Sequence, residues 1–187
     1  MFHTQCAAQS YSLIDVQGRT ATYGGAIVNF GAMLIRACGF ASNAAGSGGA
    51  IANMYGTLEM HTCTFTSNQD AEREFYGGAI INWSGTVEMH SSTFTANRAG
   101  HGGAISSYYG TMEMHSCTFT SNHASVVRFC RVPPPYTYTP LMHSQNAVMH
   151  SQNAGAVWNA FGTTSMRGCT FAANTAGEVR CRPAQTL

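Results

Sequence analysis

The chain has 187 residues, a length that suits one domain with a sizeable hydrophobic core. Its formal net charge is +1 and only 9% of its residues are charged, so composition gives no support for binding nucleic acid or an anionic membrane surface. No run of residues reaches the roughly 18 apolar positions of a membrane helix, and we expect no transmembrane segment.

Residues 1–23 do not follow the pattern of the rest of the chain and predict an N-terminal cap or a degenerate turn. They have neither the basic start nor the apolar core of a secretory signal. Of the two explanations, an intracellular protein or a sequence that lacks its true beginning, we favour the second. The regular turns described next look like part of a longer solenoid.

A repeated unit covers residues 24–122 and returns once after residue 154. The second glycine of each copy falls at positions separated by 24, 29, 25 and 52 residues, namely Gly25, Gly49, Gly78, Gly103 and Gly155. A period of about 25 residues suits one turn of a parallel β-helix and is too short for a two-helix repeat. The sequence therefore predicts an all-β protein, a right-handed parallel β-helix with about five regular turns of roughly 25 residues.

Alternation of apolar and polar residues within each copy predicts which side chains face the core. Equivalent residues should stack between neighbouring turns, about 4.8 Å apart, as ladders of identical side chains. One predicted internal stack contains Phe40, Phe65, Phe94, Phe119 and Phe171, and the asparagine ladder beside it runs from Asn43 to Asn174. In the first strand of each copy, one position tolerates any residue type and is predicted to face solvent: Val28, Ala52, Ile81, Ser106 and Trp158.

Four of the seven cysteines occupy one inward column, which Ser92 interrupts: Cys38, Cys63, Cys117 and Cys169. We interpret them as small hydrophobic core residues. Disulfides between adjacent turns remain an alternative, although a strand separation of about 4.8 Å is near the short limit for bridged Cα atoms. The pairing of Cys6, Cys130 and Cys181 cannot be read from the sequence.

Residues 123–154 break the period and contain "RVPPPYTYTP", which is typical of an extended polyproline segment. We favour a protruding loop, while a degenerate turn is the alternative because the interval between glycines is two periods long. Residues 155–187 then form the last repeat and a C-terminal tail.

The words "GGAI" followed by "FTSN" or "FTAN" resemble the repeats of the chlamydial polymorphic outer-membrane protein family. The resemblance covers Gly24 to Asn122 and resumes from Gly155 to Asn174. It implies a pectin-lyase-like, right-handed β-helix that is displayed at the cell surface, in the outer membrane or outside the cell, and that takes part in adhesion. From this sequence we expect neither the signal peptide nor the C-terminal translocating barrel that the family carries.

The most suggestive polar feature is an outward face in which "E-M-H" recurs in three copies. It places three glutamates in one ladder and three histidines in the next: Glu59, Glu88, Glu113, His61, His90 and His115. These residues are weak candidates for Zn²⁺ or Cu²⁺ ligands or for acid–base catalysis. We interpret them instead as a solvated face that the repeat copies from turn to turn, and we expect no metal, cofactor or catalytic site.

Many enzymes with the pectin-lyase-like fold cleave acidic polysaccharides through clustered aspartates, but this sequence has only Asp15 and Asp70. The rows of threonine that flank each Phe of the stack could order water and bind ice, but three rows are few and threonine is common in exposed strands. We therefore expect a non-catalytic surface or secreted repeat protein whose partner is an unknown surface protein or glycan. The alternative is a polysaccharide-active enzyme whose acidic cluster is missing or unrecognised here.

Overall fold

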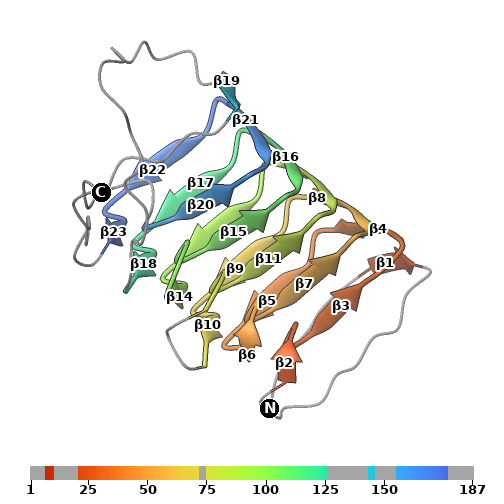
Figure 1. The fold of residues 1–187 in the computed structure, drawn as a ribbon, viewed down its shortest axis with the longest axis horizontal. Helices are drawn as coiled ribbons and strands as arrows, with labels where there is room; N and C mark the ends of the chain where they lie inside the picture. The colour runs from red at the N-terminus through yellow and green to blue at the C-terminus, as the bar shows by residue number, and fades with distance from the viewer. Residues whose placement is uncertain (1–6, 11–20, 72–74, 126–142, 146–154, 177–187) are drawn as a thin grey trace, which may run out of the picture.

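The chain forms a parallel β-solenoid in the computed structural model, which describes residues 7–10, 21–71, 75–125, 143–145 and 155–176. Among these residues every regular element is a strand. Successive rungs of four short strands stack with their strands parallel, so that each strand pairs with its equivalent in the next rung (Figure 1). Five rungs give about four complete turns, a small difference from the expected five, and the all-β parallel solenoid is confirmed.

Four sheets run along the solenoid, and we name them A to D. Sheet A contains β1 (Ala7–Ser10), β4 (Ala32–Arg36), β8 (Thr57–His61), β12 (Thr86–His90), β16 (Thr111–His115), β21 (Thr163–Arg167) and β19 (His143–Gln145). Sheet B contains β2 (Ala21–Tyr23), β6 (Ala44–Ser47), β10 (Gln69–Asp70), β14 (Arg98–Ala99), β18 (His123–Ala124) and β23 (Thr175–Ala176). Sheet C contains β3 (Ile27–Asn29), β7 (Ile51–Met54), β11 (Ile80–Trp83), β15 (Ile105–Tyr108) and β20 (Val157–Ala160). Sheet D contains β5 (Gly39–Ala41), β9 (Thr64–Thr66), β13 (Thr93–Thr95), β17 (Thr118–Thr120) and β22 (Thr170–Ala172).

Two strands of sheet A do not belong to the rungs. β1 pairs antiparallel with β4 and β19 pairs antiparallel with β21, so each covers one outer edge of this sheet. An open edge of a parallel stack would present unpaired backbone groups that attract other chains. Most of residues 1–23 and 123–154 lie outside the described residues, and the choice between loop and degenerate turn for the second segment therefore stays a prediction.

The chain turns from sheet to sheet at four corners in each rung, and most of the described corners contain a residue in the left-handed region of backbone space. The corner before sheet C uses glycine, as at Gly48 with a φ of +64°. Its neighbour Gly49 is needed for a different reason, because a Cβ there would lie 2.2 Å from the carbonyl oxygen of Gly78 in the next rung. The glycine pair therefore lets two rungs approach closely at this corner.

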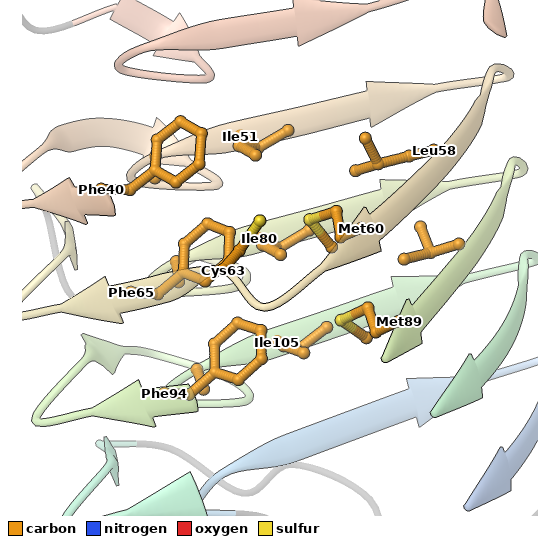
Figure 2. Packing of buried hydrophobic residues seen from close by; sticks show 14 of the residues in the cluster. Phe40, Ile51, Leu58, Met60, Cys63, Phe65, Ile80, Met89, Phe94 and Ile105 are labelled. Carbon is orange, nitrogen blue, oxygen red and sulfur yellow. The ribbon is translucent and has the colours of Figure 1, made fainter. Parts of the chain in front are cut away.

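The core is the interior of the solenoid, and the predicted phenylalanine stack runs through it. The rings of Phe40, Phe65, Phe94, Phe119 and Phe171 follow one another with centroids 4.7–4.8 Å apart and nearly parallel planes. The first four are almost completely buried, whereas Phe171 in the last rung is half-buried. Figure 2 shows three of these rings in line, beside the isoleucines of sheet C and the methionines of sheet A. The prediction of one internal stack is confirmed.

The asparagine ladder is also confirmed. The side-chain amide of Asn68 donates to Oδ1 of Asn97 at 3.0 Å, and the same bond joins the other neighbours from Asn43 to Asn174 at 2.9 Å. The amide of Asn68 also donates to the carbonyl oxygen of Phe40 in the preceding rung, at 3.0 Å. Because these groups are buried, each bond that a turn adds satisfies polar atoms that would otherwise be costly to bury.

A second ladder, in sheet C, is interrupted. Asn29 donates to Asn53, Asn53 donates to Asn82, and the Asn82 amide then donates to the hydroxyl of Ser107 at 3.2 Å. The shorter serine side chain does not continue the ladder, and the buried Oδ1 of Asn159 has no hydrogen-bond donor.

One expectation about sheet C is wrong. The side chains of Ala52, Ile81 and Ser106 were expected to face solvent, but they are fully buried, and Trp158 is only 8% exposed. The glycine corners fold over this outer face, since a Cβ on Gly48 would lie 2.6 Å from the Ile81 side chain. Sheet C is therefore packed on both faces, and the variation at this column reflects different packing partners instead of solvent.

The inward position of the cysteine column is confirmed, but its cysteines do not all have the same chemical state. Cys63 and Cys117 are free and fully buried, and Cys169 is free and half-buried. Cys38 is disulfide-bonded, so its interpretation as a simple hydrophobic residue is wrong. Cys6, Cys130 and Cys181 lie outside the described residues.

We expect the phenylalanine stack to contribute more to the free energy of unfolding than the threonine rows beside it. We expect Phe94→Ala to lower the free energy of unfolding by about 3–5 kcal/mol, because it opens a cavity between two stacked rings. Thr93→Ala, one residue away on the other face of the strand, should change it by no more than about 0.5 kcal/mol. Chemical denaturation of both variants checks this, and equal shifts of the two midpoints would mean that inside and outside are reversed.

The interrupted ladder of sheet C predicts a stabilising substitution. Ser107→Asn restores an amide that can accept from Asn82 and donate to the buried Oδ1 of Asn159, and we expect a gain of about 1 kcal/mol in the free energy of unfolding. The control is Asn82→Ser, which adds a second break to the ladder and should destabilise the protein. If Ser107→Asn is destabilising in thermal or chemical denaturation, the interior at this rung is too tight for the amide.

Candidate functional site

The Glu–His face lies on sheet A, where β8, β12 and β16 pair in register and stack equivalent residues directly on one another. The imidazole rings of His61, His90 and His115 are stacked with centroids 4.8 Å and 4.9 Å apart. The glutamates form the neighbouring ladder, as the sequence predicted. All six side chains are half-buried or exposed, so the face is open to solvent.

Each histidine is directed at the glutamate of its own rung. Nε2 lies 2.6 Å from a carboxylate oxygen in the His61–Glu59 pair, 2.8 Å in the His90–Glu88 pair and 3.9 Å in the third. The pKa of the Glu59 carboxyl is lowered, first by the hydrogen bond from His61, with desolvation opposing and the charges of His61, Arg36 and His90 adding to the shift. The pairing within a rung thus offsets the repulsion between glutamates of neighbouring rungs.

The face does not have the arrangement of a metal centre. Among the residues that the structure describes, no group of three or more His, Cys, Asp or Glu side chains could hold a metal ion. Nε2 of His61 and of His90 is engaged by a carboxylate, and the stack spreads the imidazoles along the solenoid axis instead of converging them on one point. The expected lack of a metal or catalytic site stays a prediction.

Of the two aspartates, only Asp70 lies among the described residues, and its hydrogen bonds indicate a role in holding the fold together. It is fully buried at the end of β10, and its Oδ2 accepts hydrogen bonds from the backbone N–H groups of Phe75 and Gly100. These bonds tie the residues that follow β10 to the next rung. Asp15 lies outside the described residues.

A second outward feature, which the sequence analysis did not identify, is the corner between sheets C and A. Large aromatic side chains project there from four of the five rungs, and we call them the aromatic corner: Phe30, Tyr55, Tyr109 and Phe161. They are 56–68% exposed, which makes them the most exposed large hydrophobic side chains of the described residues. In the third rung Ser84 takes the equivalent place.

The backbone at this corner makes the aromatic residues unusual. Tyr55, Tyr109 and Phe161 have φ values of 63°, 56° and 57°, in the left-handed region that disfavours bulky side chains. At the other three corners, the described residues in this region are all small: glycine, alanine, serine or threonine. A folding requirement alone would select small residues here too, so the rings point to a role outside folding.

The aromatic corner continues into a cluster of rings on the outer face of sheet C. Tyr109 and Phe161 stack at 5.1 Å, and Tyr108 contacts both edge-on. Tyr108 in turn packs against Trp83 at 4.9 Å and Trp158 at 6.3 Å. The exposed rings of the last two rungs, Tyr109 and Phe161, therefore rest on other aromatic side chains.

The surroundings of the aromatic corner are uncharged. The strands of sheet C and the corner residues that follow them contain no Asp, Glu, Lys or Arg. On the other side the corner is bordered by a row of exposed threonines that begin the strands of sheet A and pair in register: Thr57, Thr86, Thr111 and Thr163. Hydroxyl groups thus line an apolar ridge that carries no charge.

The sequence did contain a signal for this corner. The residues that follow the inward asparagine or serine of sheet C read "FG", "MYG", "WSG", "YYG" and "AFG" in successive copies, with an aromatic residue in every one. The alternation pattern did not reveal it, because the corner residues belong to neither strand.

Comparison with known families gives one match. Residues 91–108 match the model of the Chlamydia polymorphic membrane protein repeat. This stretch begins before β13 and ends at β15, and so includes Phe94, Asn97 and the glycine pair before Ile105. No curated protein and no solved structure matches the chain. With the parallel β-solenoid, the match makes the chain a β-helix repeat protein similar to the polymorphic membrane proteins.

The Glu–His face predicts a measurable coupling. In His61→Ala the Glu59 carboxyl loses its hydrogen bond, and we expect its pKa to rise toward the ordinary value of 4.5. A lowered folded-state pKa contributes stability that is present above the unfolded-state value and is lost as pH falls through the folded-state value, and this contribution should shrink in the variant.

The measurement is an NMR titration of the Glu59 side-chain carboxyl carbon. The matched control is His115→Ala, two rungs away, which should leave the pKa of Glu59 unchanged. Equal effects of the two substitutions would show that the charge of the whole face, and not the bond within the rung, sets this pKa.

Proposed function

We propose that this protein is a non-catalytic, surface-type repeat protein that binds an uncharged glycan along its aromatic corner. The repeat match and the β-solenoid support the surface class, because the matched family is one of membrane proteins. We infer a location at the cell surface, in the outer membrane or outside the cell. Among the described residues no helix has the length and apolar character needed to cross a membrane.

The observation that carries the proposal is the exposure of rings at positions where the backbone disfavours them. Tyr55 is 68% exposed at a φ of 63°, so its ring contributes little to the core while its conformation has a cost. Contiguous exposed aromatic side chains on a soluble surface mark interaction sites. Tyrosine suits such a site because it offers a large apolar face, a hydroxyl group and few rotatable bonds.

The chemistry of the corner favours a glycan over a protein or an anionic polymer. Sugar rings present apolar C–H faces that pack on aromatic rings, and their hydroxyl groups require neutral donors and acceptors around them. The aromatic corner supplies the rings, and the bordering threonines supply the hydroxyl groups. The lack of charged side chains on sheet C gives no complement for an acidic polysaccharide.

The rung spacing favours an extended chain. Equivalent residues of neighbouring rungs follow one another at strand spacing, about 4.8 Å, so aromatic rings recur along the axis in four of the five rungs and threonine hydroxyl groups recur beside them. A polysaccharide with a repeating sugar unit can use several rungs at once. Several weak contacts on one chain then add up to useful affinity, as in other multivalent binding.

The alternative is a polysaccharide-active enzyme. The fully buried Asp70 and the glutamates paired with histidine on sheet A do not form an acidic cluster near the aromatic corner in the described residues. Release of reducing sugar from the bound glycan would favour this alternative over binding alone.

The test compares neutral and acidic polysaccharides on a glycan array, with Tyr55→Gly as the variant. We expect wild-type binding to neutral chains, no release of reducing sugar, and a loss of affinity of about tenfold or more in the variant. The folded state should not be weakened, because glycine relieves a left-handed conformation that costs a bulky residue about 1–2 kcal/mol.

The matched control is Thr62→Gly, which makes the same backbone change at another exposed corner, where φ is 51°. It should retain binding. If both variants bind like the wild type, or if only acidic chains or a protein are bound, the glycan proposal for the aromatic corner is wrong.

A further inference from the structure

Two free thiols lie next to each other in the last two rungs. Cys117 directly precedes β17 and Cys169 directly precedes β22, and these strands pair in register from Thr118 and Thr170 onward. Cys63 is the other free cysteine of the described residues, and the rung between it and Cys117 carries Ser92 in the same column. In the described part of the chain, free thiols therefore occupy this column in neighbouring rungs only at Cys117 and Cys169.

We propose that Cys117 and Cys169 are a redox-responsive dithiol, which a small disulfide such as oxidised glutathione converts into a disulfide between the fourth and fifth rungs.

The geometry of the column permits this bond. In-register neighbours of a parallel sheet have Cα atoms about 4.8 Å apart, inside the usual 4.4–6.8 Å range of bridged cysteines. Both side chains have the same orientation, because each Sγ donates to the carbonyl oxygen two residues earlier, His115 for Cys117 at 3.5 Å and Arg167 for Cys169 at 3.7 Å. Each also approaches a carbonyl of the preceding rung, Met89 at 3.8 Å and Met114 at 3.6 Å.

The two thiols differ in reactivity. Interaction with the neighbouring Cys117 side chain favours the thiolate of Cys169 and lowers the pKa of Cys169 to about 6. Interaction with Cys169, together with burial, raises the pKa of Cys117. Cys169 is also the more exposed of the two, since it is half-buried while Cys117 is fully buried. Cys169 is therefore the thiolate that reacts first with a reagent from solution.

The reaction has two exchange steps. The Cys169 thiolate attacks one sulfur of oxidised glutathione, the S–S bond breaks, and one glutathione thiolate leaves. The Cys117 thiol then loses its proton to solvent and attacks the Cys169 sulfur of the mixed disulfide, which releases the second glutathione thiolate. Two protein thiols are oxidised and one glutathione disulfide is reduced, so electrons balance.

The disulfide would strengthen the attachment of the last rung, where the core is less completely buried than in the rung before it. The phenylalanine ring of the fifth rung, Phe171, is half-buried, whereas Phe119 beneath it is fully buried. The two cysteines are 52 residues apart, so the bond closes a long loop and ties the last rung to the fourth. Oxidation thus offers control over whether the last rung, with Phe161 of the aromatic corner, stays docked.

The test is peptide mapping of the full chain before and after incubation with oxidised glutathione. Trypsin cleaves after Arg98, Arg128, Arg167 and Arg180, so the two cysteines fall in separate peptides, 99–128 and 168–180. We expect these peptides to be joined after oxidation, to separate on reduction, and the oxidised protein to melt several degrees higher than the reduced one.

The control variants are Cys117→Ser and Cys169→Ser, since Ser92 shows that serine fits this column. Neither variant should give the linked peptide or the redox-dependent melting temperature. Cys63, which is buried beside Ser92, should remain available to alkylation after denaturation of the oxidised protein. The proposal is overturned if both peptides remain unlinked, or if Cys169 is joined to a cysteine other than Cys117.

Discussion

Backbone hydrogen bonds between one rung and the next hold this protein together, and they require that every rung follow the same path. The N–H group of a corner residue donates to the equivalent region of the following rung, as Ala37 does to the carbonyl of His61 at 2.9 Å and Tyr55 does to that of Trp83 at 2.9 Å. A rung that turned at a different place would break these bonds along all four sheets. The left-handed corners and the close approach of the glycine pairs are consequences of that requirement.

This constraint places each side chain directly on the equivalent side chain of the next rung. The contribution of a residue type to stability therefore depends on how two side chains of that type interact when they are stacked. Phenylalanine and asparagine gain from such contact, through ring stacking and through amide bonds that pass from rung to rung. Stacked glutamates instead destabilise the structure, because like charges at strand spacing repel each other. The histidine two residues later compensates within the rung, and arginine follows at both ends of the histidine stack, where Arg36 pairs with His61 and Arg167 with His115.

The sequence predicts much of this structure because the repeat states the same pattern several times. The alternation that placed Phe94 and Asn97 inside is repeated in every copy, and the structure confirms both ladders of which they are part. The outer face of sheet C was not predictable in this way. Ile81 is fully buried and lies beneath a glycine corner of the neighbouring rung, a contact that alternation within one strand does not report. The disulfide state of Cys38 is likewise outside what a column of cysteines can show.

The positions at which a rung departs from the repeat show which columns the fold does not constrain. Ser107 interrupts a ladder in the fourth rung, while Ser84 interrupts the aromatic corner and Ser92 separates two thiols in the third, yet the strands of both rungs stay in register with their neighbours. Each rung therefore tolerates variation at these columns without loss of the path. A column that the fold leaves free, and that still contains bulky rings in a costly conformation, is determined by something other than folding. For this protein that reasoning selects the corner between sheets C and A, since the left-handed residues that the structure describes at the other three corners are all small.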